Sequence, residues 1–173
     1  MYRSSILSLS AVMAFALLLP QGGALAQPKS MKDQLVGTWT LLLADDVKAD
    51  GSQAGAFGPN PLGQLMFTPD GHYSLQIARS NLPKFAANSR QKGTPEENKA
   101  AVQGSVSYFG TYTVDDASKV LNIRVEGSSY PNLDDTRQKR QITALTDDTL
   151  TWSNPITGNP ELVRAEFAWK KVK

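Results

Sequence analysis

The chain has 173 residues, with 18 lysine and arginine residues, 16 aspartate and glutamate residues, one histidine and no cysteine. Without cysteine no disulfide can form, so burial alone must hold the core together. The near balance of charge predicts neither a nucleic-acid-binding surface nor electrostatic binding to membranes. A single histidine with no cysteine also argues against a transition-metal site, so we expect no metal and no cofactor.

Residues 1–26 are predicted to be a cleaved signal peptide. Arg3 supplies a positive charge, an apolar run extends from Ile6 to Leu19, and Ala24-Leu25-Ala26 forms a small-residue cleavage site. The run is shorter than the ~20 apolar residues that span a bilayer. We therefore expect a periplasmic or secreted protein, with a single mature domain over residues 27–173.

Alternating segments rich in β-branched and aromatic residues predict eight strands. In chain order they cover residues 34–44, 63–68, 71–79, 105–115, 119–127, 137–146, 149–154 and 161–171. One short helix is predicted at 95–103. Thr94 is its N-cap, Pro95 takes its first position, and Glu97 completes a capping box.

The lengths of the connections predict how the strands are arranged. Short Asp-rich turns follow the second, fourth and sixth strands, whereas the connections 45–62, 80–104, 128–136 and 155–160 are longer. If the strands run alternately up and down, the short turns meet at one end, the base, and the long loops at the other, the mouth. Closing eight such strands removes exposed edges and leaves room for one small ligand. We predict an all-β, eight-stranded up-and-down antiparallel barrel.

Strict alternation assigns the side chains that face the barrel interior. These inward positions are Leu35, Gly37, Trp39, Leu41, Leu43, Leu65, Phe67, Tyr73, Leu75, Ile77, Val106, Tyr108, Tyr112, Val114, Leu121, Ile123, Val125, Ile142, Ala144, Leu150, Trp152, Val163, Ala165, Phe167 and Trp169. Trp39 falls at the base, where a large indole would seal the narrow end, and Gly37 would let a neighbouring group approach closely. Because the last strand brings Trp169 beside it, we expect Gly37, Trp39 and Trp169 to form a structural plug.

Several quoted stretches resemble the bacterial and fungal lipocalin-like domain family. They are "LVGTWTLL", "FGPNPLGQLMFTPDGHYSLQIAR", "GTPEE", "YFGTYTVD" and "VEGSSYPN", which together extend from Leu35 to Asn132. The resemblance implies a lipocalin-like β-barrel of the calycin type, in which a ligand is expected inside the barrel.

A few polar side chains stand out as candidates for ligand binding. Alternation extends the inner face to Arg79, Gln138 and Arg140 near the mouth, and an unpaired guanidinium facing an apolar interior must reach water, a carboxylate or a ligand anion. The arginines can instead reach the rim or pair with loop acids such as Asp134. The remaining predicted ligand-binding residues, which would contact an apolar ligand body, are Phe57, Tyr108 and Trp152.

Catalytic motifs are missing from the sequence, and we predict no catalytic residue. His72, the only histidine, follows a tight turn and has no evident partner for acid–base chemistry. Four aspartate pairs, among them Asp45-Asp46, fall at predicted strand ends, where turn chemistry explains them.

These features favour an exported, monomeric protein that binds a small amphipathic or hydrophobic molecule inside its barrel. Two alternatives stay open. A barrel enzyme of the isomerase or cyclase type would use the pocket to impose conformation and exclude water, and an inward carboxylate near Tyr108 would favour it. A packed barrel would instead act through its outer surface as an envelope interaction module.

Overall fold

The computed structural model describes residues 29–156 and 159–173, so the predicted signal peptide over 1–26 lies outside the described residues. The strands are β1 (Gly37–Lys48), β2 (Gln53–Gly55), β3 (Leu62–Phe67), β4 (His72–Ala78), β5 (Ser105–Asp115), β6 (Val120–Ser128), β7 (Arg137–Leu145), β8 (Thr149–Pro155) and β9 (Leu162–Lys171). The helical segments are α1 (Met31–Leu35), α2 (Pro95–Gly104) and two 3-10 turns, η1 (Arg90–Lys92) and η2 (Pro131–Leu133).

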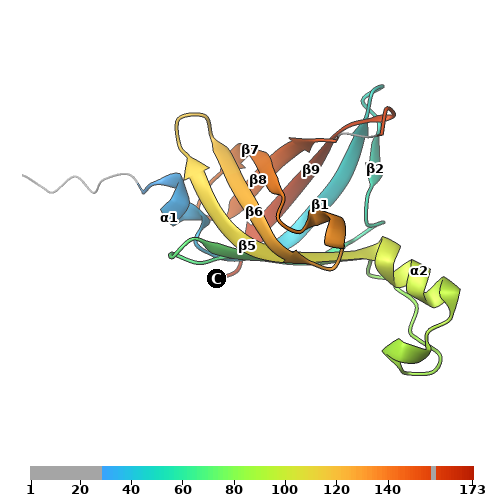
Figure 1. Cartoon of the computed structure of the whole chain (residues 1–173). Coiled ribbons are helices and arrows are strands. Elements are labelled where there is room, and N and C mark those ends of the chain that lie inside the picture. Colours follow the sequence, from blue (N-terminus) through green and yellow to red (C-terminus); the bar gives the residue numbers. More distant parts are fainter. Residues whose placement is uncertain (1–28, 157–158) are drawn as a thin grey trace, which may run out of the picture.

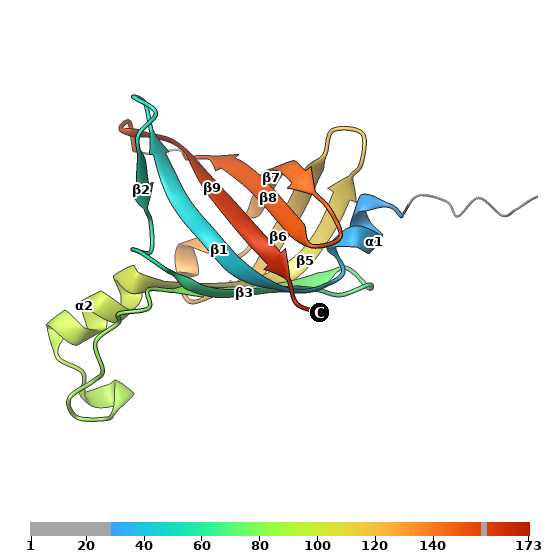
Figure 2. The ribbon, with the colours of Figure 1, turned by 180° about the vertical axis from the view of Figure 1, so that it is seen from behind.

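The strands close into a barrel. They pair antiparallel in the order β2-β1-β3-β4-β5-β6-β7-β8-β9, and β1 also pairs with β9 from Trp39–Lys171 to Lys48–Leu162. Eight strands therefore complete the ring, while β2 only adds a short stretch beside the end of β1 (Figure 2). The predicted eight-stranded up-and-down barrel is confirmed.

The two α-helices mark the two ends of the barrel (Figure 1). α1 lies at the base, together with the short β3–β4, β5–β6 and β7–β8 connections. α2 continues from the start of β5 and projects beyond the strands at the mouth. Its capping box is confirmed, because the Thr94 side chain accepts from the Glu97 N–H and the Glu97 carboxylate accepts from the Thr94 N–H.

The base is closed by a helix that sequence analysis missed. The predicted first strand begins at residue 34, but residues 31–35 form α1, and the strand begins at Gly37 with a positive φ of 130°. Leu35 is fully buried, and its carbonyl accepts a hydrogen bond of 2.8 Å from the Trp39 indole N–H. Lys171 lies over the Trp39 ring, with Nζ 4.9 Å from the centroid, and donates to the Gln34 carbonyl at 2.7 Å. Trp39 and Trp169 are both fully buried at this end.

Two β-bulges correct the predicted inner face. The pairing of β1 with β9 skips Leu42, so beyond this point Ala44 rather than Leu43 faces inward. The pairing of β7 with β8 skips Thr143, which leaves Ala144 exposed. An extra residue in one strand shifts the alternation by one position, and a pattern of strict alternation cannot locate it.

The first long connection is shorter than predicted. Instead of leaving the barrel at residue 45, β1 continues to Lys48 and then turns back to pair with β2 at Asp45–Val47. Asp45 and Asp46 therefore lie inside a strand, and the assignment of this pair to a turn is wrong. The hydrogen-bonded ladder on both sides of the strand outweighs the low β-propensity of aspartate.

Candidate ligand-binding site

Aromatic rings line much of the barrel interior. On β8 and β9, Trp152 lies 5.4 Å from Trp169 and 5.9 Å from Phe167, measured between ring centroids. Across the interior, on β4 and β5, Tyr73 and Tyr108 meet edge to face at 6.0 Å. Such walls suit a flat or apolar ligand body, because offset and edge-to-face ring contacts add to the gain from burial.

Arg140 is the one buried charged residue of the described chain, with 8% of its surface exposed. The pairing of β6 with β7 sets Arg140 opposite Leu121 and Gln138 opposite Ile123, which places both polar residues on the inner face. The Arg140 guanidinium donates to the Gln138 side-chain oxygen and to the Lys139 carbonyl. Both acceptors are neutral, and none of the ion pairs found in residues 29–156 and 159–173 includes Arg140. No carboxylate of the described residues therefore lies within ion-pair distance of its charge.

Four further polar atoms are buried without a hydrogen-bond partner in the described residues. They are Tyr73 Oη, Trp152 Nε1, Asn154 Oδ1 and Trp169 Nε1. All four residues occupy inner-face positions on β4, β8 or β9. Buried polar groups are nearly always paired in folded proteins, with protein groups or ordered water, so these four atoms keep hydrogen-bonding capacity that the described residues do not use.

The Tyr73 hydroxyl is a further polar group of the barrel interior. Burial raises its pKa far above the usual tyrosine value, Tyr108 and the Glu126 carboxylate add to the rise, and the Arg140 charge opposes it. The ring contact with Tyr108 and the electrostatic influence of Arg140 and Glu126 show that these groups surround the Tyr73 hydroxyl. Tyr73 is consequently a neutral hydrogen-bonding group at any physiological pH.

The structure brings only some of the predicted site residues together. Tyr108, Gln138, Arg140 and Trp152 share the barrel interior. Phe57 is partly buried at the rim, where it lines a hollow together with residues 101–103 of α2 and Tyr130.

Arg79 lies apart from this group. It is exposed, its N–H donates to the Gly104 carbonyl at 2.8 Å, and it lines a shallow surface hollow against α2. The strand that would have carried its side chain inward ends at Ala78. A ligand-binding role for Arg79 stays a prediction.

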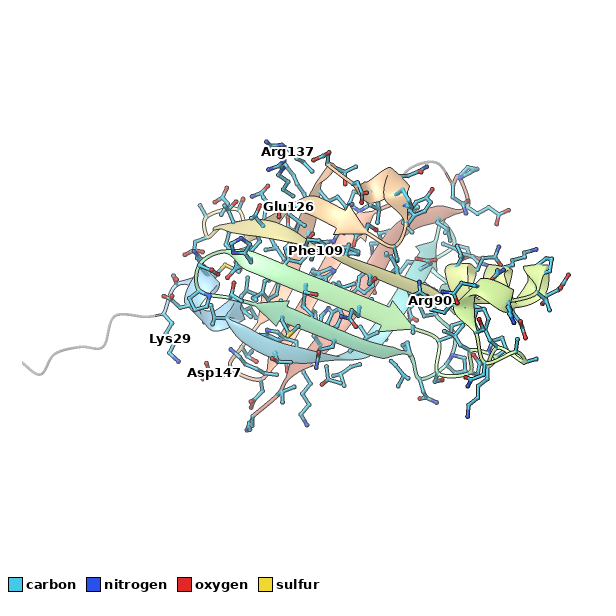
Figure 3. All side chains as sticks on the ribbon, turned by 60° about the horizontal axis from the view of Figure 1, so that its bottom comes forward. Lys29, Arg90, Phe109, Glu126, Arg137 and Asp147 are labelled. Atoms are coloured by element: carbon cyan, nitrogen blue, oxygen red, sulfur yellow. The ribbon has the colours of Figure 1, made fainter. Side chains whose placement is uncertain are left out.

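Two polar residues of the interior were missed by sequence analysis. Asn154 follows Trp152 by two positions on β8 and is the last residue of the predicted strand 149–154, so alternation alone could have placed it on the inner face. Asp46 reaches the inner face only through the bulge at Leu42. Glu126, in contrast, lies at the bulge between β5 and β6 and is exposed, as is Phe109 on the outer face of β5 (Figure 3).

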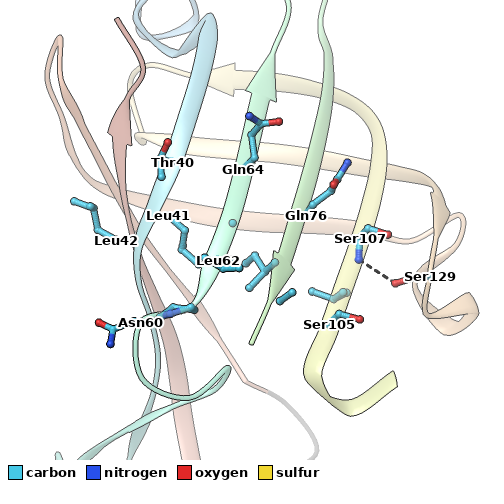
Figure 4. A pocket seen from close by; sticks show the side chains of 15 residues that line it. Thr40, Leu41, Leu42, Asn60, Leu62, Gln64, Gln76, Ser105, Ser107 and Ser129 are labelled. Atoms are coloured by element: carbon cyan, nitrogen blue, oxygen red, sulfur yellow. Dashed lines mark hydrogen bonds between the residues drawn. The ribbon is translucent and has the colours of Figure 1, made fainter. Parts of the chain in front are cut away.

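A separate hollow of about 870 Å³ lies on the outer face of β1, β3, β4 and β5 (Figure 4). Its polar lining comes from outward positions such as Thr40, Gln64 and Gln76, and exposed Leu42 and Leu62 border it. It is distinct from the barrel interior.

Among the described residues, no helix is long and apolar enough to cross a membrane, and no group of three or more His, Cys, Asp or Glu side chains is placed to hold a metal ion.

A closed eight-stranded antiparallel barrel with an aromatic, partly polar interior defines the class of lipocalin-like barrels. The sequence pattern of the lipocalin-like domain family matches residues 36–172. The chain belongs to this family, as its sequence resemblance implied.

Known proteins similar to the chain include the 4'-hydroxy-3'-methoxypropiophenone carrier protein ppsC of Aspergillus oryzae (strain ATCC 42149 / RIB 40). It is 30% identical over 107 residues, which cover 57% of this chain and 96% of that protein. A crystal structure of a lipocalin-like protein from Bacteroides uniformis ATCC 8492 is 16% identical, with a TM-score of 0.44, and the match covers 80% of this chain and 99% of that one. A redesigned β-barrel is 14% identical, with a TM-score of 0.40, over 84% of this chain and 99% of that one.

Proposed function

We propose that the protein is an exported, monomeric carrier that binds one small amphipathic aromatic molecule inside its barrel. In this proposal Arg140 holds an anionic or strongly accepting group of the ligand, and the Trp152, Phe167 and Tyr108 rings contact its apolar body. The observation that carries the proposal is the buried Arg140 guanidinium, whose hydrogen-bond partners are all neutral.

Physical chemistry supports a binding role for this arginine. A buried guanidinium costs several kcal/mol of desolvation, and hydrogen bonds to neutral acceptors recover less of that cost than a carboxylate would. A ligand carboxylate, phenolate or carbonyl would supply the missing partner, and Arg is well suited to bind planar acceptors. The name of the Aspergillus relative, a carrier of an aryl ketone, supports an aromatic ligand.

Export rests on the sequence of residues 1–26, with its apolar run and Ala24-Leu25-Ala26 site. Export can be tested by expressing the full chain in a Gram-negative host and measuring the mass of the protein that osmotic shock releases. A mass that begins at Gln27 is expected. Full-length protein retained in the cytoplasm would contradict export without affecting the proposed ligand site.

A pair of probes of equal size tests the binding site. 3-Phenylpropionate carries a carboxylate and 3-phenyl-1-propanol does not, and quenching of Trp152 and Trp169 fluorescence reports the binding of either. Arg140→Gln is expected to weaken binding of the acid about 10- to 100-fold, the scale of a hydrogen bond to a charged group, and to leave the alcohol within about twofold. Arg124→Gln, on the outer face and paired with Asp135 at 3.5 Å, is the matched control.

Two results would contradict the proposal. Equal weakening of the acid and the alcohol by Arg140→Gln would mean that the arginine shapes the barrel without contacting the ligand. Identical binding of the acid by wild type and Arg140→Gln would place the site elsewhere, for example on the outer face. Mass spectrometry of small molecules extracted from the natively purified protein would then show which class the chain retains.

A further inference from the structure

The bulge in β1 places a carboxylate inside the barrel. Before the bulge, Leu41 faces inward opposite Trp169. Leu42 is the extra residue and is 57% exposed. After it, Ala44 pairs with Phe167 and Asp46 with Ala165, so Asp46 takes an inner position among residues that are otherwise apolar.

Asp46 belongs to a row of residues that runs around the interior towards Arg140. Ala165 of β9 pairs with Asp46 on one side and with Asn154 of β8 on the other. The register that pairs Gln141 with Ser153 sets the preceding residue of β7, Arg140, opposite Asn154 of β8. Adjacent strands lie about 4.8 Å apart, so the row spans roughly 14 Å of the barrel wall. Ala165, in the middle of the row, contributes only a methyl group.

The two ends of this row have opposite hydrogen-bonding character. Arg140 only donates, whereas the Asp46 carboxylate accepts, and the buried Asn154 Oδ1 lies between them as an acceptor without a partner. Neither Asp46 nor Arg140 takes part in an ion pair within the described chain. Burial raises the pKa of Asp46, and the neighbouring Asp45 adds to the rise. Asp46 is partly buried and Arg140 is buried, so the row carries a partly exposed acceptor at one end and a buried donor at the other.

The next row towards the base supplies a surface for an aromatic ring. Trp152 pairs with Phe167, which pairs with Ala44, directly beside the row of Asn154, Ala165 and Asp46. The Trp152 indole N–H is buried without a partner. A ring placed here would have donors at the Arg140 end and acceptors at the Asp46 end.

Resting on the carrier function proposed above, we propose that Asp46, together with Asn154, accepts a hydrogen bond from a hydroxyl group at the end of the ligand opposite to the group held by Arg140. The ligand class is then small aromatic acids or aryl ketones with a hydroxyl on the far side of the ring. Asp46 determines the preference for a ring with a free hydroxyl over a ring whose hydroxyl is converted to an ether. An ether oxygen has no proton to donate and would face the carboxylate as a second acceptor.

Isothermal titration calorimetry with two further probes tests this assignment. 3-(4-Hydroxyphenyl)propionate carries the donor, and 3-(4-methoxyphenyl)propionate has the same acid group with the donor removed. The wild-type protein is expected to bind the hydroxyl probe about tenfold more tightly or better. Asp46→Ala should reduce this preference to within about twofold. Asp45→Ala, on the opposite face of the same strand, should keep it.

A second variant checks the position of the ligand without changing a charge. Ala165→Leu places a larger side chain between Asp46 and Asn154, and it should weaken both probes at least tenfold in a protein whose circular dichroism spectrum is unchanged. If both probes bind this variant as they bind the wild type, the ligand does not lie over the row and the inference is overturned.

The remaining outcomes separate this inference from the proposed function. If wild type and Asp46→Ala share the same preference, or if the wild type shows none, the role of Asp46 is wrong while binding at Arg140 stands. If the wild-type protein binds neither of these probes nor 3-phenylpropionate, the proposed function and the inference fail together.

Discussion

The base and the middle of this barrel differ in how many of their buried polar groups are paired. At the base, the Trp39 indole N–H donates to the Leu35 carbonyl, Lys171 donates to the Gln34 carbonyl, and the Tyr112 hydroxyl donates to the Thr68 carbonyl. In the middle, Trp152 and Asn154 each bury a polar atom without a partner. At the base only the Trp169 indole N–H has no partner among the described residues. Most polar groups of the base therefore stabilise the fold, whereas those of the middle keep hydrogen-bonding capacity at the expense of stability.

Removing the ring at the base should have the largest effect. Trp39→Ala is expected to lower the free energy of unfolding by about 3–5 kcal/mol, as large aromatic truncations in a packed core do. The variant also removes the surface that Lys171 covers and the donor to Leu35. Urea unfolding followed by circular dichroism measures the change. A loss below about 1 kcal/mol would show that α1 closes the base without help from the indole.

The same conservative substitution in both regions should sharpen the contrast. Trp39→Phe and Trp152→Phe remove an indole N–H and leave a similar small void. Only the first leaves a buried carbonyl, that of Leu35, without its donor. We expect Trp39→Phe to cost about 1–2 kcal/mol more than Trp152→Phe in the same unfolding experiment. Equal losses would mean that the Trp152 indole N–H has a partner in solution.

The smallest expected effect depends on pH and concerns Asp46. Its folded-state pKa is raised above the ordinary value of 3.8, so protonation of Asp46 favours the folded state and its ionisation opposes folding. The favourable contribution is fully present below the unfolded pKa and is lost as pH rises through the folded one. Asp46→Asn should therefore unfold at a slightly higher temperature than wild type at pH 7.

The control for this prediction is the same measurement at low pH. At about pH 3, below the unfolded pKa, the aspartate is mostly protonated in both states, so differential scanning calorimetry should show the two melting temperatures converging. A difference that persists unchanged at low pH would assign the effect to the shape of the side chain or to hydrogen bonding.

The barrel could be predicted from the sequence because its signals are local and repeated. Alternation, Asp-rich turns and the Thr94–Glu97 capping box each involve residues close in the chain, and the strands they predict are present. The inner position of Arg140 also followed from alternation, because the pairing of β6 with β7 contains no bulge.

The parts that were missed depend on contacts between distant residues. The bulge at Leu42 arises from the fit of β1 to β9, more than a hundred residues later in the chain, and no local pattern marks it. Five residues suffice for α1, whose stability comes from the buried Leu35 side chain and the hydrogen bond from Trp39, since so short a helix has little stability of its own. The Asp46 site depends on the first of these features, and sequence reasoning had no means to find it.

The positions of α1 and of the end of β9 also determine how the barrel is oriented when it is attached through its C-terminus. α1 and the C-terminus lie at the base, where Lys173 pairs with Asp148 of the β7–β8 turn at 3.4 Å, while the long loops and α2 lie at the opposite end (Figures 1 and 2). A linker attached after Lys173 would therefore hold the barrel with its mouth turned away from the support. Immobilised in this way, on a sensor surface or beside a fused enzyme, the protein would keep the route into its interior unobstructed.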